Sequence, residues 1–124
     1  MPINPTLSLI VLRVADIERS AAFYASLGLN FTRENHGAGP EHFSTRVGET
    51  VFELYPASER FPVTTVRLGF GVESIPAVLN HWRGRHCRIL SEPQDSPYGL
   101  RAVVADPDGH RVELTQIPSH RPEQ

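Results

Sequence analysis

The stretch Asp106-Pro-Asp-Gly-His-Arg-Val-Glu113 decides how this chain is expected to fold. Its proline presets φ at the second position of a turn, and Gly109 accepts the positive φ that the fourth position favours. An apolar run at 100–105 precedes the turn, and an alternating run at 111–116 follows it. The stretch therefore predicts a β-hairpin whose second strand directs Glu113 away from its apolar neighbours.

Length and composition limit the classes of protein to consider. The chain has 124 residues, with 40% hydrophobic and 21% charged residues, which is typical of one globular domain. A net charge of −2 without a basic run argues against a nucleic-acid-binding protein. No apolar stretch has the length of a membrane span, and Met1–Pro5 lacks the features of a signal peptide. The single Cys87 cannot form an intrachain disulfide, so we expect a cytoplasmic location.

The first half of the chain predicts one strand, one helix and three further strands. Residues 7–14 form an apolar run that predicts a strand. Asp16 then offers a side-chain oxygen to a helix start, and Gly28 ends the helix. The remaining strands are predicted at 29–34, 42–47 and 51–55.

The second half repeats this order of elements. A strand at 66–72 precedes a helix that Ser74 caps and Gly84 ends. A short strand at 87–90 and a loop at 91–99 with two prolines lead to the hairpin described above. Ser74 follows Asp16 by 58 positions, and Glu113 follows Glu53 by 60. The chain is therefore predicted to contain two strand–helix–strand–strand–strand modules.

These modules are expected to form a single domain, residues 1–124, because neither half could bury both faces of its sheet alone. Module one is predicted at 7–56 and module two at 65–117, with a linker at 57–64 between them. A polar tail follows at 118–124.

Several motifs together resemble the vicinal oxygen chelate (VOC) superfamily, which includes glyoxalase I, extradiol dioxygenases, and fosfomycin- and bleomycin-resistance proteins. They are Val14-Ala-Asp-Ile-Glu-Arg-Ser20 followed by Phe23-Tyr24, and Asp106-Pro-Asp-Gly109 leading into Val112-Glu-Leu114. The resemblance covers residues 7–117. It implies an α+β fold in which two βαβββ modules form a cupped, mostly antiparallel sheet, with a homodimer and a site on the concave face.

Enzymes of this superfamily hold a divalent metal with ligands from the first and last strands of each module. Carried over to this sequence, the last-strand positions are Glu53 and Glu113, and the first-strand positions are Leu9 and Arg67. Leucine has no donor atom and arginine stays protonated, so neither can hold a cation. No metal or other cofactor is therefore predicted. A divalent metal would need a rebuilt site from Glu53, Glu113 and His42.

Alternation along the strands places one set of side chains on the cup face. The ligand-binding residues predicted there are Arg67, Leu9, Val11, Arg13, Tyr55, Tyr98 and Arg101. The alternative for Arg13 and Arg101 is a solvated strand position. Arg67 could replace the positive charge of the metal by pairing with a carboxylate. His110, directly after the turn, is assigned no role.

Two functions from different classes remain open. The first is a homodimeric binding protein, similar to the bleomycin-resistance members, that holds a small organic ligand without metal. The second is a lyase, isomerase or dioxygenase, either metal-dependent through the rebuilt site or metal-free. In the metal-free version, Glu53 or Glu113 is the catalytic general base, with a pKa raised by burial, and Arg67 stabilises negative charge. A further alternative for both glutamates is that they are former metal ligands that the chain has retained. A further alternative for the protein is that it acts only through its dimer interface.

Overall fold

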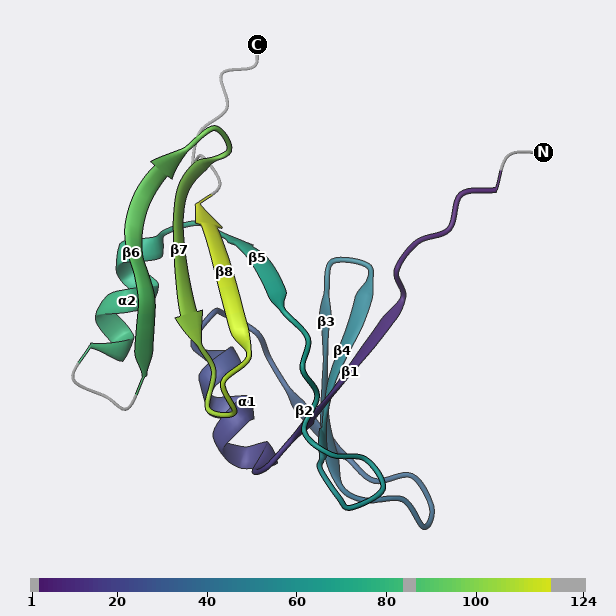
Figure 1. Ribbon diagram of the computed structural model, residues 1–124. Coiled ribbons are helices and arrows are strands. Elements are labelled where there is room, and N and C mark those ends of the chain that lie inside the picture. The colour runs from purple at the N-terminus through teal and green to yellow at the C-terminus, as the bar shows by residue number, and fades with distance from the viewer. Residues whose placement is uncertain (1–2, 84–86, 117–124) are drawn as a thin grey trace. The chain divides into compact units, whose positions relative to one another are not determined.

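The structure, a computed structural model, describes residues 3–83 and 87–116 (Figure 1). The chain divides into two compact units, Met1–Thr64 and Thr65–Gln124. Each unit contains one of the two predicted modules. The predicted helix end at Gly84 and the predicted tail lie outside the described residues. Neither helix of the described chain has the length and apolar character needed to cross a membrane.

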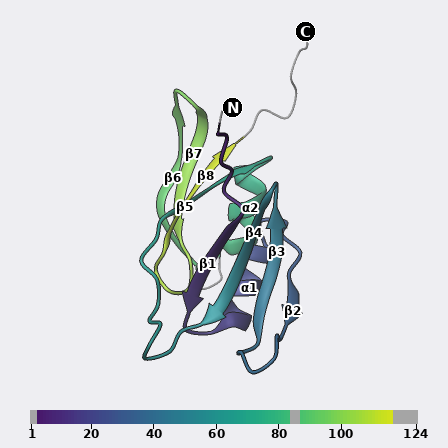
Figure 2. The same ribbon diagram turned by 90° about the vertical axis from the view of Figure 1, so that its right-hand side faces the viewer.

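Module one contains the predicted strand, helix and three strands. They are β1 (Leu9–Val14), α1 (Ile17–Ala25), β2 (Thr32–Glu34), β3 (His42–Val47) and β4 (Thr50–Pro56). The four strands form one sheet in the order β1-β4-β3-β2, in which β1 and β4 are parallel and the other pairs are antiparallel. Figure 2 shows α1 behind this sheet, and the helix contacts β3 and β4.

Module two repeats the arrangement. Its elements are β5 (Leu68–Val72), α2 (Ile75–Trp82), β6 (Arg88–Ser96), β7 (Gly99–Ala105) and β8 (Arg111–Gln116). The sheet order is β5-β8-β7-β6, again with one parallel pair, β5 and β8. The α2 helix contacts β7 and β8. Two four-stranded mixed sheets with one helix each confirm the predicted α+β fold of two βαβββ modules.

Both helices begin at the predicted caps. The Asp16 side chain accepts hydrogen bonds from two backbone N–H groups of the first turn of α1 at 3.0 and 3.2 Å, and Ser74 accepts one in α2 at 3.1 Å. The apolar face of each helix is buried against its sheet. In α1, the Tyr24 ring packs edge-on against Phe52 with ring centroids 5.1 Å apart, and in α2 Trp82 is buried.

The β7–β8 hairpin has the predicted turn. Gly109 has a φ of 92° and donates a backbone hydrogen bond to the Asp106 carbonyl at 2.9 Å. Val112 and Leu114 are fully buried on the α2 side of the sheet. Glu113 therefore lies on the opposite, open side of β8, as the alternation predicted.

The prediction of a loop at 91–99 is wrong. The strand β6 continues to Ser96 and pairs with β7, with register shifts between Ile89 and Ser91 and between Ser91 and Gln94. Pro93 lies in the second of these irregularities, and β6 is an edge strand, so the missing N–H removes no ladder bond that the sheet requires. Elsewhere each described strand begins within three residues of its predicted start, and the largest difference is at Thr32.

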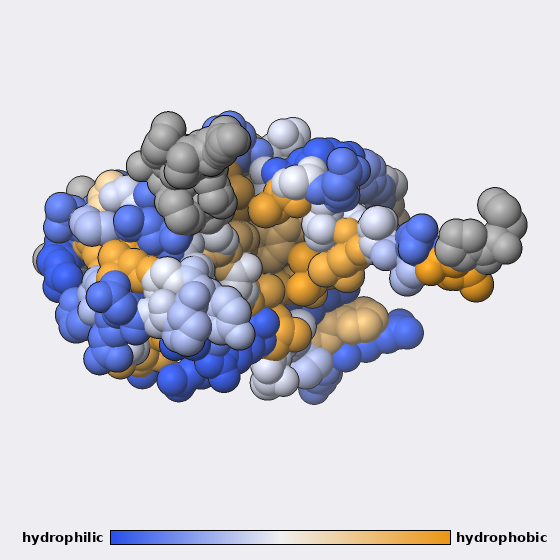
Figure 3. Space-filling model, turned by 90° about the horizontal axis from the view of Figure 1, so that it is seen from above, coloured by the Kyte–Doolittle hydropathy of each residue, from blue (hydrophilic) through white to orange (hydrophobic). Residues whose placement is uncertain are grey.

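Apolar side chains are exposed before β1. Ile3 is 89% exposed and Leu7 is 65% exposed. The space-filling view shows apolar surface along this N-terminal segment, at the right of Figure 3.

Candidate functional site

One face of the first sheet is turned away from α1. Phe52 is buried toward the helix, so its neighbours Glu53 and Tyr55 lie on the opposite face. The strand register places Val11 beside Glu53 and Arg13 beside Tyr55. We call this surface the first open face. It brings together the predicted residues of β1 and β4.

An aromatic and cationic cluster occupies one end of the first open face. The Tyr55 ring stacks on the His42 ring, with centroids 4.1 Å apart and planes 8° from parallel. The Arg13 guanidinium carbon lies 4.9 Å from the centroid of Tyr55 and 4.3 Å from that of Phe61. Burial, with a further contribution from Glu53, raises the pKa of Tyr55.

The other predicted residues of this face are less constrained. Leu9 is 52% exposed and Val11 is half-buried. The half-buried carboxylate of Glu53 has no salt bridge in the described part of the chain. Neither Val11, which lies beside Glu53, nor the first-strand position Leu9 supplies a donor atom. Module one therefore lacks the ligand that a metal of the superfamily type would need.

On the second sheet, two arginines hold the Glu113 carboxylate. Arg101 Nη2 lies 3.0 Å from Glu113 Oε1, and Arg67 Nη2 forms an ion pair with Glu113 Oε2. The hydrogen bond from Arg101, together with that from Arg67, holds the pKa of Glu113 below its usual value although burial opposes the effect. This direction is opposite to the rise expected of a general base.

We call the side of the second sheet that faces away from α2 the second open face; it includes Arg67, Gly69, Arg101 and Glu113. This face does not fit a metal of the superfamily type either. Arg67 is positively charged and is paired with the carboxylate that would be the second ligand. A guanidinium at that position repels a cation and offers it no lone pair. No chemical step is therefore derived through a metal at these positions.

Open space lies beside this ion-pair cluster. Gly69 pairs with Glu113 in the strand register, and a Cβ at Gly69 would meet no atom within 4 Å. Tyr98, predicted as a pocket wall, lies just before β7 and is 83% exposed. The structure thus brings Arg67, Arg101 and Glu113 together, and leaves the role of Tyr98 a prediction.

The sequence interpretation missed a buried pair at the β7–β8 turn. His110 Nδ1 lies 2.8 Å from Asp106 Oδ2, and Asp106 Oδ1 accepts the backbone N–H of His110 at 2.8 Å and that of Asp108 at 3.0 Å. Both side chains of the pair are at most 1% exposed. The carboxylate closes the turn, so this is a structural contact. An aspartate four residues before a histidine, across a turn, was the available signal.

The sequence interpretation also missed a cluster of metal-binding side chains in module one. One ligand atom from each of Glu34, His36 and His42 lies within 4.8 Å of the others, a spacing that could hold a metal ion. The rebuilt site was predicted to combine His42 with Glu53 and Glu113. Within module one, His42 groups with two side chains of β2 and the loop after it, and the rebuilt site stays a prediction. Asp106, Asp108 and His110 form the other such group.

Comparison with known proteins decides the family. The family model described as Glyoxalase/Bleomycin resistance protein/Dioxygenase superfamily matches residues 6–114. The chain belongs to this superfamily. The match spans both modules and includes Glu53 in β4 and Glu113 in β8.

Relatives in this superfamily have different names. The chain is 27% identical to a "Probable lactoylglutathione lyase" of Synechocystis sp., over 90% of this chain and 95% of the relative. It is 25% identical to the phenazine antibiotic resistance protein EhpR of Enterobacter agglomerans, over 93% of each chain. The crystal structure of TnmS3, an antibiotic-binding protein from Streptomyces sp., shares the fold with a TM-score of 0.75 and 22% identity, over 96% of this chain and 100% of TnmS3.

Proposed function

We propose that this member of the superfamily binds a small organic ligand through an anionic oxygen, without a metal at the superfamily's positions. The observation that carries the proposal is the cluster of two arginines around one carboxylate on the second open face. One carboxylate neutralises only one of the two guanidinium groups. The cluster therefore keeps a positive charge beside the open space at Gly69.

The geometry suits recognition of an oxygen anion. The side chains of Arg67 and Arg101 are 57% and 37% exposed, so part of each guanidinium faces solvent. Each group has five N–H donors, and Glu113 engages only some of them. The carboxylate also holds the donors in place, which lowers the ordering cost of binding.

A planar, aromatic ligand is the class we favour. The names of two relatives, a phenazine resistance protein and an antibiotic-binding protein, support a ligand of this kind.

Calorimetric titration with phenazine-1-carboxylate and with uncharged phenazine tests the proposal. We expect saturable binding that is at least about tenfold tighter for the carboxylate, because a charge-assisted hydrogen bond contributes roughly 1.5–3 kcal/mol. Arg101→Gln should weaken carboxylate binding by a similar factor. Arg88→Gln, which changes an exposed arginine of β6 without an ion pair in the described residues, is the matched control.

A second variant tests the location. Gly69→Phe should block binding, because the new ring would fill the open space and the extended backbone there needs no glycine. Asn80→Phe on the exposed side of α2 adds the same ring elsewhere. Equal affinity for both compounds, or binding that survives both Arg101→Gln and Gly69→Phe, would contradict the proposal.

An enzyme is the second candidate function. One relative is named a probable lactoylglutathione lyase, and Glu53 has no salt bridge in the described residues that would hold its carboxylate. The test is turnover of the hemithioacetal of methylglyoxal and glutathione, with and without added Ni²⁺ or Zn²⁺. Turnover that Glu53→Gln abolishes and Glu113→Gln spares would favour this candidate over simple binding.

The homodimer and the cytoplasmic location stay predictions. Light scattering on the untagged protein tests the first, with an expected mass of about twice the 13.8 kDa chain. Fractionation of the native host tests the second.

A further inference from the structure

Three side chains with metal-binding atoms meet where β2 leads into β3. Glu34, the last residue of β2, pairs directly with His42, the first residue of β3, so the two side chains share one face of the sheet. His36 follows in the connecting loop. All three offer a ligand atom within 4.8 Å of the others.

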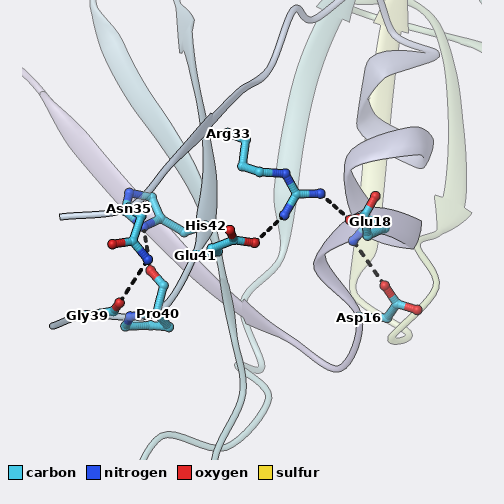
Figure 4. A network of polar contacts seen from close by, with 8 residues as sticks. All are labelled: Asp16, Glu18, Arg33, Asn35, Gly39, Pro40, Glu41 and His42. Atoms are coloured by element: carbon cyan, nitrogen blue, oxygen red, sulfur yellow. Dashed lines mark hydrogen bonds and ion pairs between the residues drawn. The ribbon is translucent and has the colours of Figure 1, made fainter. Parts of the chain in front are cut away.

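The hydrogen bonding of His42 leaves a lone pair directed at this cluster. His42 Nδ1 lies 3.2 Å from the Pro40 carbonyl oxygen, which can only accept, so Nδ1 carries the hydrogen (Figure 4). In the neutral ring, Nε2 is then an acceptor. This atom is buried and has no hydrogen-bond partner among the described residues. It lies 3.3 Å from Glu34 Oε1, a second acceptor. Either a hydrogen on Nε2 or a metal ion between the two atoms would satisfy both acceptors.

Two of the three distances among these ligand atoms match those around a coordinated ion. Ligands at about 2.0–2.1 Å around a tetrahedral ion lie roughly 3.3 Å from one another. Glu34 Oε1 lies 3.3 Å from His42 Nε2 and 3.2 Å from His36 Nε2. All three ligand atoms lie within 4.8 Å of one another, and the exposed His36 side chain can adjust to a shared ion.

The surroundings support these ligands and leave them accessible. Stacking on Tyr55 and the Pro40 contact fix the His42 ring, as outer contacts of metal-bound histidines do. Arg33, which directly precedes Glu34 in β2, forms ion pairs with Glu18 and Glu41 (Figure 4). The His36 side chain is 72% exposed and that of Glu34 is 33% exposed, so an ion can enter from solvent.

We infer that Glu34, His36 and His42 form a zinc-type divalent metal site, with a fourth position open to water. Two imidazoles and one carboxylate suit Zn²⁺, whereas Mg²⁺ and Ca²⁺ prefer an all-oxygen set. None of the three residues occupies a metal position of the superfamily. The site thus does not depend on Leu9 or Arg67, or on ligand binding at Arg101.

Zinc titration of the untagged, chelator-treated full chain tests the inference. We expect one ion per chain by calorimetry. A hundredfold excess over Kd should raise Tm by roughly 10 °C, because zinc binds only the folded state. His36→Gln and Glu34→Gln should each weaken zinc binding by roughly a hundredfold or more, since each removes one of three ligands. Both residues are partly exposed, so these variants should fold.

Matched controls separate this site from other histidines and acids. His81→Gln, on the exposed side of α2, and Asp108→Asn, in the other metal-type group, should leave the zinc affinity unchanged. Absence of zinc uptake would overturn the inference, as would uptake that survives both His36→Gln and Glu34→Gln. Nitrogen NMR that shows a hydrogen on His42 Nε2 in the presence of zinc would also overturn the inference. The ring would then be an imidazolium that forms an ion pair with Glu34.

Discussion

Glu53 and Glu113 occupy equivalent positions of the two modules, yet their surroundings differ. Each lies on the strand that pairs in parallel with the first strand of its module, and each faces away from the helix. Glu53 lies beside Val11 and has no salt bridge in the described residues, whereas Glu113 lies beside Gly69 between two arginines. The repeated backbone therefore determines where a side chain lies, and its neighbours determine which ion pairs it forms.

The two clusters of histidines and acids differ in the same way. At the β7–β8 turn, Asp106 accepts hydrogen bonds from backbone N–H groups and from His110, so its carboxylate serves the fold. Beside β2, the buried Nε2 of His42 has no hydrogen-bond partner in the described chain and faces Glu34. A buried polar atom without a partner is the feature that distinguishes a site for a ligand from a structural contact.

The substitutions with the largest expected effect on stability test whether the two modules are equally well packed. Leu54→Ala in β4 and Leu114→Ala in β8 each remove a fully buried side chain. Each should lower the free energy of unfolding by about 3 kcal/mol, through lost burial and the cavity left behind. Urea denaturation measures both. A loss below 1 kcal/mol in only one module would show that its core relaxes and that the packing is not equivalent.

The next largest effect on stability is expected at the β7–β8 turn, which the buried carboxylate of Asp106 closes. Asp106→Ala should cost about 2–3 kcal/mol, because it leaves buried N–H groups and the His110 ring without their acceptor. Glu49→Ala, at the exposed turn of module one, is the control and should change stability by less than about 0.5 kcal/mol. Equal effects of the two substitutions would contradict the structural role of Asp106.

A smaller effect distinguishes the two helix caps. Asp16→Ala should cost about 1 kcal/mol, because two N–H groups of α1 lose their acceptor. Ser74→Ala should cost less, because the side-chain oxygen of Gln116 still accepts the N–H of Ile75 at 2.8 Å. Thermal unfolding of each variant measures the difference. The double variant Ser74→Ala, Gln116→Ala should lose at least as much stability as Asp16→Ala.

The smallest effect concerns pH. The folded-state pKa of Glu113 is lowered by Arg101 and Arg67, so its stabilising contribution is present above the unfolded pKa of about 4.3. That contribution is lost as pH falls through the folded pKa. Carboxyl NMR titration should show the Glu113 pKa rising toward its usual value in Arg101→Gln. An unchanged pKa would mean that Arg101 does not hold the carboxylate in solution.

The sequence predicted much of the fold because the signals are local. Proline and glycine determine the turn at 106–109, and Asp16 and Ser74 cap their helices with short-range hydrogen bonds. The loop predicted at 91–99 is wrong for the same reason. Local rules count Pro93 against a strand, but its place on a sheet edge, which depends on all four strands, removes the penalty.

Part of the candidate site was predictable as well. Alternation along β4 and β8 predicted that Glu53 and Glu113 lie on the open faces, and the guanidinium of Arg67 predicted a carboxylate partner for it. The sequence did not pair Arg101 with Glu113, because that contact depends on the β7–β8 register and on long side chains. It also assigned no role to His36.

The sequence by itself determined the order of the elements, the repeat, the caps and the faces of the strands. These follow from side-chain periodicity and backbone preferences that act over a few residues. Only the tertiary structure decided which charges meet. The register brings His42 opposite Glu34 and Arg101 near Glu113, and burial leaves one imidazole nitrogen without a hydrogen-bond partner in the described chain. Such contacts depend on distances between strands, which no local pattern specifies.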